Sequence, residues 1–187
     1  MQILAHCSAS VEALLEREAV EAAFTALAPL FEFDGSGERT ALFVVSSNAG
    51  SATSMRFWAE AVRTGVALAS PELFPWCLAN APCGAIARRF GITGPNFSCL
   101  GEADALSGAL QAAADELATA RGDAAVIVAY EFAAAAHSHA EFLGLRLGGA
   151  GSSRGLRPAP AEVEFAGLSL RAVISARAES LRERSPG

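Results

Sequence analysis

The stretch that decides the fold is NFSCLGEADALSGALQAAADELATARGDAAVIVAYE, residues 96–131. It opens with the strand-like run NFSCL, turns at Gly101, and continues with leucine and alanine at the spacing of one helical face. This spacing predicts a helix over 104–121, with Gly122 as its terminator. The apolar run DAAVIVAYE, 123–131, predicts a strand buried on both faces. Strand, helix and strand in this order favour parallel α/β layering.

The same alternation continues towards the N-terminus. ALFVVSS, residues 41–47, is an apolar run with β-branched side chains and predicts another buried strand. SATSMRFWAEAVRTG, 51–65, predicts a helix that a glycine closes, and a further helix is predicted over 82–90. Ser10 is expected to cap the first helix of the chain, because apolar residues at helical spacing follow it.

The C-terminal segments carry weaker patterns. HSHAEFLGLRLGG, residues 137–149, is interpreted as a short helix, and 149–160 as a loop. FAGLSLRAVISARAESLRER, 165–184, is interpreted as a last strand that leads into a short helix. Because no domain boundary or repeat is visible, 1–187 is expected to form one domain.

Composition disfavours several classes of protein. The net charge of −6 leaves no basic face for nucleic acid. No apolar run approaches the roughly 20 residues of a membrane-spanning helix. The four cysteines, which lack the paired spacing of a zinc site, and an N-terminus without a signal-peptide profile indicate a cytoplasmic protein with reduced thiols.

Residues 70–131 resemble the N-terminal half of β-ketoacyl synthases, which have a thiolase-like fold. SPELFPWCLANAPCGAIARRFGITGPNFS, 70–98, is similar to a passage that runs SPxxxP, N-x-x-A-G-x-I-A and G-x-x-GP in that family. The matching residues are Ser70, Pro71, Asn80, Gly84, Ile86, Ala87, Gly91, Gly94 and Pro95. RGDAAVIVAYE resembles the family's RGDADVALAGGAE, with Glu131 as its closing acid, and AGLSLRAVISARAES resembles the end of the N-terminal half. The resemblance implies an α/β fold with a mainly parallel mixed sheet layered with helices.

The chain departs from active ketosynthases at the turn after NFSCL. The family carries its catalytic cysteine there, and counting from Gly94 places Ala103 at that position. The family's two histidines and its lysine lie in a C-terminal half that is expected to be absent from this chain. Gly101-Glu102 followed by Asp104 is similar to a truncated group of chain length factors linked to aryl-polyene pigment clusters. The resemblance therefore implies no catalytic residue.

Chain length factors pair with an active ketosynthase and are thought to bound the tunnel in which the acyl chain grows. The resemblance predicts a non-catalytic subunit of a β-ketoacyl synthase complex, active in polyketide or fatty-acyl elongation, with no cofactor. A full-length ketosynthase is the expected partner, and an acyl carrier protein is expected to be contacted through it. Seven residues are the candidates for the tunnel wall and the interface: Phe74, Trp76, Leu78, Ala81, Cys83, Glu102 and Asp104.

Two other functions remain open from the sequence. A divergent thiolase-class acyltransferase or hydrolase would use Cys83, near a helix N-terminus, or Cys99, within the NFSCL strand, although both thiols are more simply small buried hydrophobic groups. A homodimeric acyl-binding module would instead cover one half-fold with another copy.

Other polar residues have plainer interpretations. Glu102 and Asp104 are favourable acids at a helix N-terminus. His6, His137 and His139 form no recognisable metal motif, because an H-x-H pair alone is a weak signal, and a polar loop is the preferred interpretation.

Overall fold

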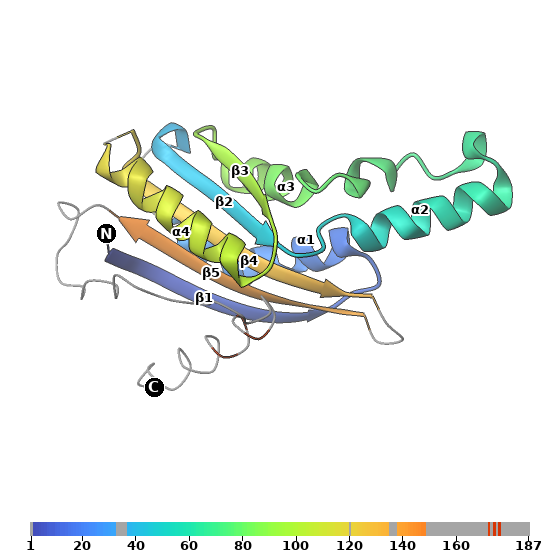
Figure 1. Cartoon of the computed structure of the whole chain (residues 1–187), viewed down its shortest axis with the longest axis horizontal. Helices are drawn as coiled ribbons and strands as arrows, with labels where there is room; N and C mark the ends of the chain where they lie inside the picture. The colour runs from blue at the N-terminus through green and yellow to red at the C-terminus, as the bar shows by residue number, and fades with distance from the viewer. Residues whose placement is uncertain are drawn as a thin grey trace.

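A five-stranded mixed sheet carries the fold (Figure 1). The computed structural model describes residues 2–32, 37–119, 121–134 and 138–148, together with Ala172, Ile174 and Ala176. In spatial order the strands are β1 (Gln2–Glu12), β5 (His139–Gly148), β4 (Ala124–Ala133), β2 (Thr40–Ser46) and β3 (Asn96–Leu100). β2 pairs in parallel with β3 and β4, whereas β5 pairs antiparallel with β4 and β1. The predicted α/β fold with a mixed sheet is confirmed.

The two central strands are apolar on both faces, as the sequence predicts. Every residue of β2 is buried, and so is β4 from Ala124 through Tyr130. Along both strands the even-numbered side chains join one core cluster and the odd-numbered ones join another, because successive side chains of a strand point to opposite faces. Helices must therefore cover both faces of the sheet.

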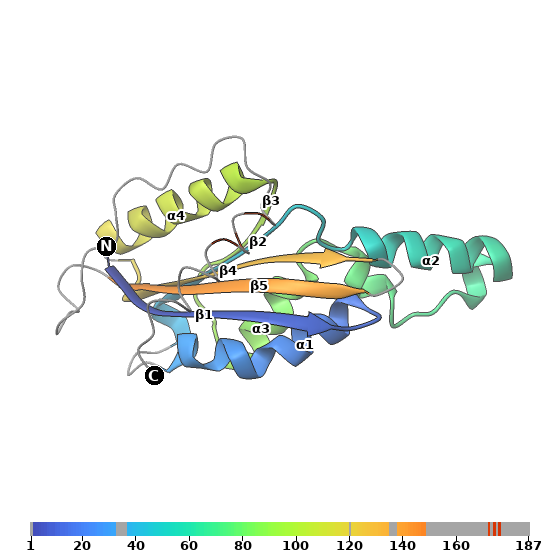
Figure 2. The ribbon, with the colours of Figure 1, turned by 90° about the horizontal axis from the view of Figure 1, so that it is seen from below.

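The helices are α1 (Glu16–Leu27), α2 (Ser51–Thr64), α3 (Ala81–Phe90) and α4 (Ala103–Ala118), with short 3-10 helices η1 (Ala28–Phe31), η2 (Gly37–Arg39), η3 (Val66–Leu68) and η4 (Phe74–Cys77). α1 and α3 cover one face of the sheet and α4 covers the other (Figure 2). Val20 of α1 and Ile86 of α3 lie in the first core cluster, whereas Leu106 of α4 lies in the second. Both helical layers use the apolar stripes that the sequence shows.

The N-terminal segment corrects one prediction. Residues 2–12 form β1, and the first helix begins at Glu16 rather than after Ser10. Ala5, Cys7 and Ala9 pack against the core at a period of two, which is the period of a strand. The helix-like spacing of residues 11–15 concealed the strand. Its pairing partner gave no local signal either, because the ten-residue ladder joins β1 to β5, which is distant in the sequence.

The C-terminal segment corrects a second prediction. The segment interpreted as a short helix over 137–149 is β5, whose even-numbered side chains face α1 while Leu143 and Leu147 face the α4 side. His137 and the loop over 149–160 lie outside the described residues. Within 165–184 the described residues are Ala172, Ile174 and Ala176, which are helical, and Ile174 is buried in the cluster beneath α4. A smaller correction concerns α4, which ends at Ala118 rather than at residue 121.

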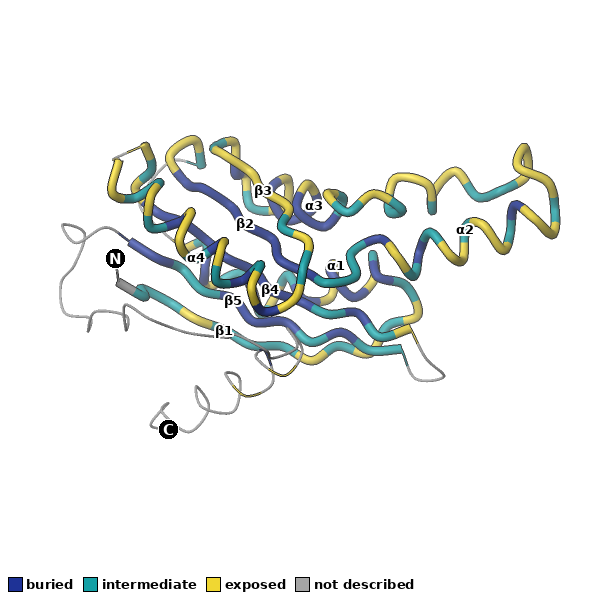
Figure 3. The backbone as a smooth tube through the Cα atoms, viewed as in Figure 1, coloured by how far each residue is buried: buried dark blue, intermediate teal, exposed yellow. Residues whose placement is uncertain are grey.

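One segment projects beyond the end of the sheet (Figure 1). We call residues 51–78, which hold α2, η3 and η4, the arm. α2 ends at Thr64 and is closed by Gly65, as predicted; the φ of Gly65 is 92°. The buried residues of α2 are Thr53 and Ala61, and much of the arm's surface is exposed (Figure 3). The large apolar side chains exposed on the arm are Met55, Trp58, Val62, Val66, Leu68, Phe74 and Leu78.

Candidate functional site

The strand-turn-helix elbow forms as the sequence predicts. β3 ends at Leu100, Gly101 has φ of 149°, and α4 begins at Ala103. Glycine suits this turn because a Cβ there would meet the Ala105 Cβ at 3.0 Å and because its φ is unfavourable for other residues. The Gly101 N–H donates to the Ser46 carbonyl oxygen at 3.2 Å, which continues the parallel ladder into the turn.

The elbow presents a methyl group to the protein core. Ala103 is 1% exposed and packs with Leu106 in the cluster beneath α4. Glu102 and Asp104 flank it and are exposed. The Asp104 carboxylate accepts a hydrogen bond from the Ala105 N–H at 3.0 Å, a contact that suits an acid in the first turn of a helix. No hydroxyl, thiol or amine occurs between residues 101 and 104, so the turn carries no nucleophile.

The two thiols near the elbow lie in environments that disfavour the thiolate. Cys83 is buried against β3, with its Sγ 3.6 Å from the Phe97 carbonyl oxygen. Burial raises the pKa of Cys83, and it also raises the pKa of the half-buried Cys99. Because the thiolate is the nucleophilic form, neither residue is activated here.

The seven candidate residues fall in three places. Phe74 and Leu78 are exposed on the arm, while Trp76 is half-buried against the core cluster of α1 and α3. Ala81 and Cys83 open α3, beside β3. The remaining two, Glu102 and Asp104, flank the elbow. The seven residues therefore extend from the arm to the edge of the sheet, and they do not line one cavity.

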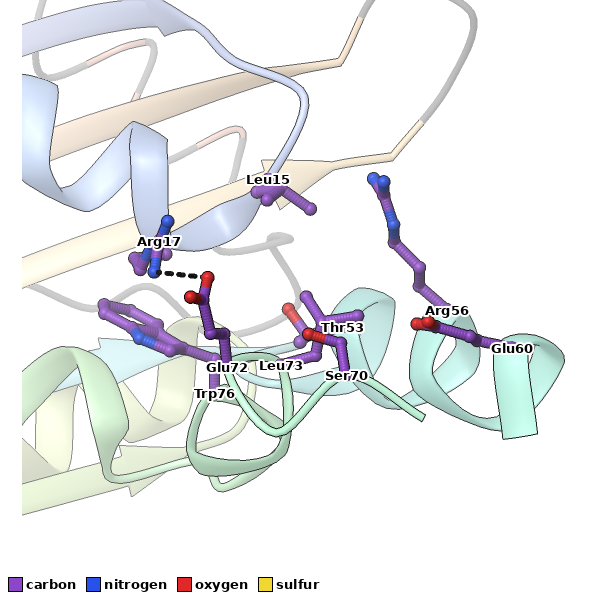
Figure 4. A pocket seen from close by; sticks show the side chains of 9 residues that line it. All are labelled: Leu15, Arg17, Thr53, Arg56, Glu60, Ser70, Glu72, Leu73 and Trp76. Atoms are coloured by element: carbon purple, nitrogen blue, oxygen red, sulfur yellow. Dashed lines mark ion pairs between the residues drawn. The ribbon is translucent and has the colours of Figure 1, made fainter. Parts of the chain in front are cut away.

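The pocket near these residues has charged walls. It lies between the start of α1 and the arm and has a volume of about 300 Å³ (Figure 4). Arg17 and Glu72 face each other across it, with Nη1 and Oε2 3.9 Å apart, and Arg56 and Glu60 line it from α2. Trp76 is the one tunnel candidate in its lining. Such walls do not suit an aliphatic acyl chain, which requires apolar surroundings.

A polar cluster that the sequence analysis missed lies where β2 and β4 end. The buried carboxylate of Glu16 accepts a hydrogen bond from the Tyr130 hydroxyl at 2.6 Å. The Gly50 N–H donates to the two carboxylate oxygens at 3.1 and 3.0 Å, and the Thr53 hydroxyl donates at 3.4 Å. The cluster therefore connects α1, β4 and the start of α2.

A second carboxylate holds the same loop from the sheet side. Glu131 accepts hydrogen bonds from the backbone N–H and the hydroxyl of Ser47, both at 2.6 Å. The Asn48 amide donates to the Phe132 carbonyl oxygen at 2.8 Å. Glu131, which matches the closing acid of the ketosynthase-like run, thus holds the loop between β2 and α2.

Burial controls the electrostatics of this cluster. Burial raises the pKa of Glu16, the hydrogen bonds from Tyr130, Gly50 and Thr53 lower it, and the charge of Glu131 raises it slightly. Burial and the neighbouring Glu16 carboxylate raise the pKa of Tyr130 well above its usual range, so its hydroxyl keeps its proton and acts as a donor. Tyr130, the single tyrosine of the chain, follows an apolar run and was a sequence signal for this cluster, because a buried phenol needs a partner.

The described residues hold neither a cluster of metal-ligating side chains nor a helix suited to crossing a membrane. Across the described ranges, no three His, Cys, Asp or Glu side chains lie close enough together to hold a metal ion. His6 is exposed on β1 and His139 begins β5. Among the helices that the structure describes, none combines the length and the apolar character that crossing a bilayer requires.

Comparisons with known proteins place the fold. No protein-family model matches the sequence, and no curated protein matches it either. Solved structures do match, among them the ishigamide ketosynthase/chain length factor, with a TM-score of 0.54 and 17% identity over 66% of this chain and 39% of that chain. A complex of an acyl carrier protein with its hexaketide-bound type II polyketide ketosynthase, AntDE:AntF, has a TM-score of 0.51 and 13% identity over 67% of this chain and 44% of that chain.

A third structure is similar over most of its length. It is the ketosynthase ApeO in complex with its chain length factor ApeC from Xenorhabdus doucetiae, with a TM-score of 0.52 and 13% identity. The match covers 80% of this chain and 81% of that chain, whereas this chain spans about two fifths of the other two. The chain therefore has the thiolase-like fold of ketosynthase and chain length factor subunits.

Proposed function

We propose that this chain is a non-catalytic, chain-length-factor-like partner of an active ketosynthase and shapes the tunnel in which a carrier-bound polyketide or fatty-acyl chain grows. The observation that carries the proposal is the elbow, where Ala103 occupies the position expected for the nucleophile. A buried methyl group cannot form a thioester. The likeness to ketosynthase and chain length factor complexes, one of them with a chain of similar length, supports the same function.

The outer edge of the sheet supports a partner-binding role. β3 is one of the two edge strands of the sheet, and each of its five residues is exposed or half-buried. An edge strand offers backbone groups that another strand can pair with. Phe97 is 41% and Leu100 58% exposed, and the Phe97 ring stacks on Phe43 with 4.8 Å between centroids. Apolar side chains on an open edge suit an interface with a second subunit.

The arm supplies a second apolar surface. Seven large apolar side chains are exposed on this one segment, and a concentration of exposed apolar side chains commonly marks an interaction site. In the proposed complex the ketosynthase covers the arm and β3. The tunnel wall would form only in the complex, because the candidate residues do not enclose one cavity in this chain alone: Phe74, Trp76, Leu78, Ala81 and Cys83. Glu102 and Asp104 at the elbow would lie near the interface. The acyl carrier protein would reach this chain mainly through the ketosynthase.

Cellular location follows from the proposal rather than from the fold. A subunit that handles carrier-bound intermediates would act in the cytoplasm. All four cysteines, Cys7, Cys77, Cys83 and Cys99, are free thiols, as a reducing compartment allows.

Co-purification tests the partnership. The tagged chain is co-expressed with the full-length, cysteine-bearing ketosynthase from the same gene neighbourhood, and the two are expected to elute together. Leu100→Asp places a charge on β3 and is expected to separate them. Leu14→Asp is the matched control, because Leu14 is also exposed but follows β1 at the opposite edge of the sheet. Separate elution of the wild-type subunits, or a stable homodimer of this chain alone, would contradict the proposal.

Product length tests the tunnel. Ala81→Phe adds volume to the proposed wall and is expected to shorten the product, whereas Trp76→Ala removes volume and is expected to lengthen it. Condensation should continue in both variants, because the partner carries the chemistry. Leu68→Ala, on the arm but outside the proposed wall, is the control. Unchanged product lengths in both wall variants, measured by mass spectrometry, would show that these residues do not bound the tunnel.

A further inference from the structure

The arm begins at a helix that has no cap of its own. The N-cap residue of α2 is Gly50, with φ of 75°, and no side-chain capping hydrogen bond comes from this position. The first turn of α2 contains no acidic residue. The first N–H groups of a helix lack partners within the helix and need acceptors from elsewhere. The root of the arm, by which we mean Gly50 and the first turn of α2, therefore depends on a hydrogen-bond acceptor outside α2.

Glu16 supplies that group from another helix. Both of its carboxylate oxygens accept from the Gly50 N–H, and one also accepts from Thr53 in the first turn of α2. Glu16 is free for this role because α1 has a separate acid at its own start: the Glu18 carboxylate accepts from the Leu15 N–H at 3.1 Å. The Tyr130 hydroxyl holds Glu16 in place from β4.

The returning limb of the arm rests on the same root. A Cβ on Gly50 would lie 2.7 Å from the Cys77 carbonyl oxygen, so η4 packs directly against the residue that Glu16 holds. The Ser54 hydroxyl donates to the same Cys77 carbonyl oxygen at 3.2 Å. With Thr53 and Ala61 as the buried residues of α2, these few contacts fix how the arm leaves the sheet.

We propose that Glu16 is a positioning residue that caps α2 from α1. Together with Glu131 of β4, which holds the loop before α2, it sets the orientation of the arm. Glu16 holds the helix start, and Glu131 holds Ser47, three residues earlier. The inference rests on the proposed function only in naming the ketosynthase as the subunit that the arm meets. We call the two carboxylates, Glu16 and Glu131, the brace. A substitution of Glu16 is expected to change binding of the partner because it changes the orientation of the arm.

Hydrogen exchange in the isolated chain tests the brace. Glu16→Ala is expected to speed amide exchange in residues 51–64 by about tenfold, because a hydrogen-bonded charged acceptor is lost. Glu16→Gln, which keeps an acceptor oxygen, is expected to restore much of the protection. Exchange in β4 and β5 should accelerate less than exchange in residues 51–64 in both variants, although Glu16→Ala also removes the partner of Tyr130 on β4. Glu21→Ala is the control, because Glu21 is exposed on the same helix.

A second variant covers the case in which Glu16→Ala does not fold. Ser47→Ala removes the hydroxyl that Glu131 binds and leaves the buried cluster intact, so it is expected to speed exchange in residues 51–64 to a smaller extent. Unchanged exchange of the arm in Ser47→Ala, with Glu16→Ala unfolded or unchanged, would overturn the proposal. Equal acceleration in the arm and the sheet would overturn it too, because it would indicate general destabilisation.

Binding to the ketosynthase separates this inference from the proposed function. Glu16→Ala is expected to weaken binding by about tenfold or more, with Glu16→Gln close to wild type. If the wild-type chain binds no ketosynthase but the exchange results hold, the proposed function fails and the brace stands. If the wild type binds and a loosened Glu16→Ala arm binds equally well, the arm's orientation does not govern the partnership and that part of the inference fails.

Discussion

The Tyr130 hydroxyl and the Glu16 carboxylate are 2.6 Å apart and join β4 to the first residue of α1, across 114 positions of the chain. Tyr130 is 0% and Glu16 1% exposed, so neither group can exchange this partner for water. Removing one member of a buried pair leaves the other unsatisfied, which costs more than the pair contributes. The contact therefore links stability of the core to the root of the arm.

Tyr130→Phe tests the strength of this contact. The variant keeps the ring and removes the hydroxyl, and it is expected to lower the free energy of unfolding by about 1–3 kcal/mol. The same change in a Glu16→Gln background is expected to cost less, because the acceptor is then neutral. Urea denaturation of the four proteins gives the coupling energy. Equal costs in the two backgrounds would show that the hydroxyl acts independently of the carboxylate.

The pH dependence of stability should carry a signature of Glu16. Burial raises the pKa of Glu16 above its ordinary value of 4.5. A group of this kind contributes stability that is fully present below its unfolded pKa and lost as pH rises through its folded pKa. The difference in free energy of unfolding, wild type minus Glu16→Gln, is therefore expected to fall as the pH rises above the ordinary pKa of 4.5. A difference that rises with pH would mean that the hydrogen bonds outweigh burial.

Two glycines at the ends of α2 allow a matched comparison. Gly50 and Gly65 both have positive φ, so alanine at either position incurs backbone strain of about 1–2 kcal/mol. A Cβ at Gly65 meets nothing within 4 Å, whereas one at Gly50 meets the Cys77 carbonyl oxygen. Gly50→Ala is expected to lower the thermal midpoint more than Gly65→Ala. Equal midpoints would show that η4 does not press against the root of the arm.

The thiols should resist alkylation at neutral pH. Burial raises the pKa of Cys7 to about 11, and it raises the pKa of Cys83 and Cys99 as well. Because the thiolate reacts and the thiol does not, iodoacetamide at about pH 8 is expected to modify these residues at least about tenfold more slowly than in the denatured chain. Peptide mass spectrometry measures each site. Rapid modification of native Cys83 or Cys99 would support a thiol-dependent enzyme.

The candidate site was only partly predictable. The elbow and its missing nucleophile follow from consecutive residues, Gly101 to Asp104, whose turn depends on local backbone geometry. The cluster around Glu16 could not be predicted in this way. Its members come from α1, α2 and β4, and Glu16 looks like an ordinary acid in the first turn of a helix until the fold places Gly50 and Tyr130 against it.

The strands also differ in whether the sequence alone predicts them. β2 and β4 are recognisable from their own apolar runs. A strand buried on both faces needs apolar side chains along its length, whichever strands pair with it. β1 and β5 do not, because each is recognisable mainly through the antiparallel ladder that it forms with the other. Hydrogen bonds between such distant segments leave little trace in either one alone. The sequence by itself thus determined the parallel centre of the sheet and the empty elbow, whereas tertiary pairing decided its antiparallel edge and the anchoring of the arm.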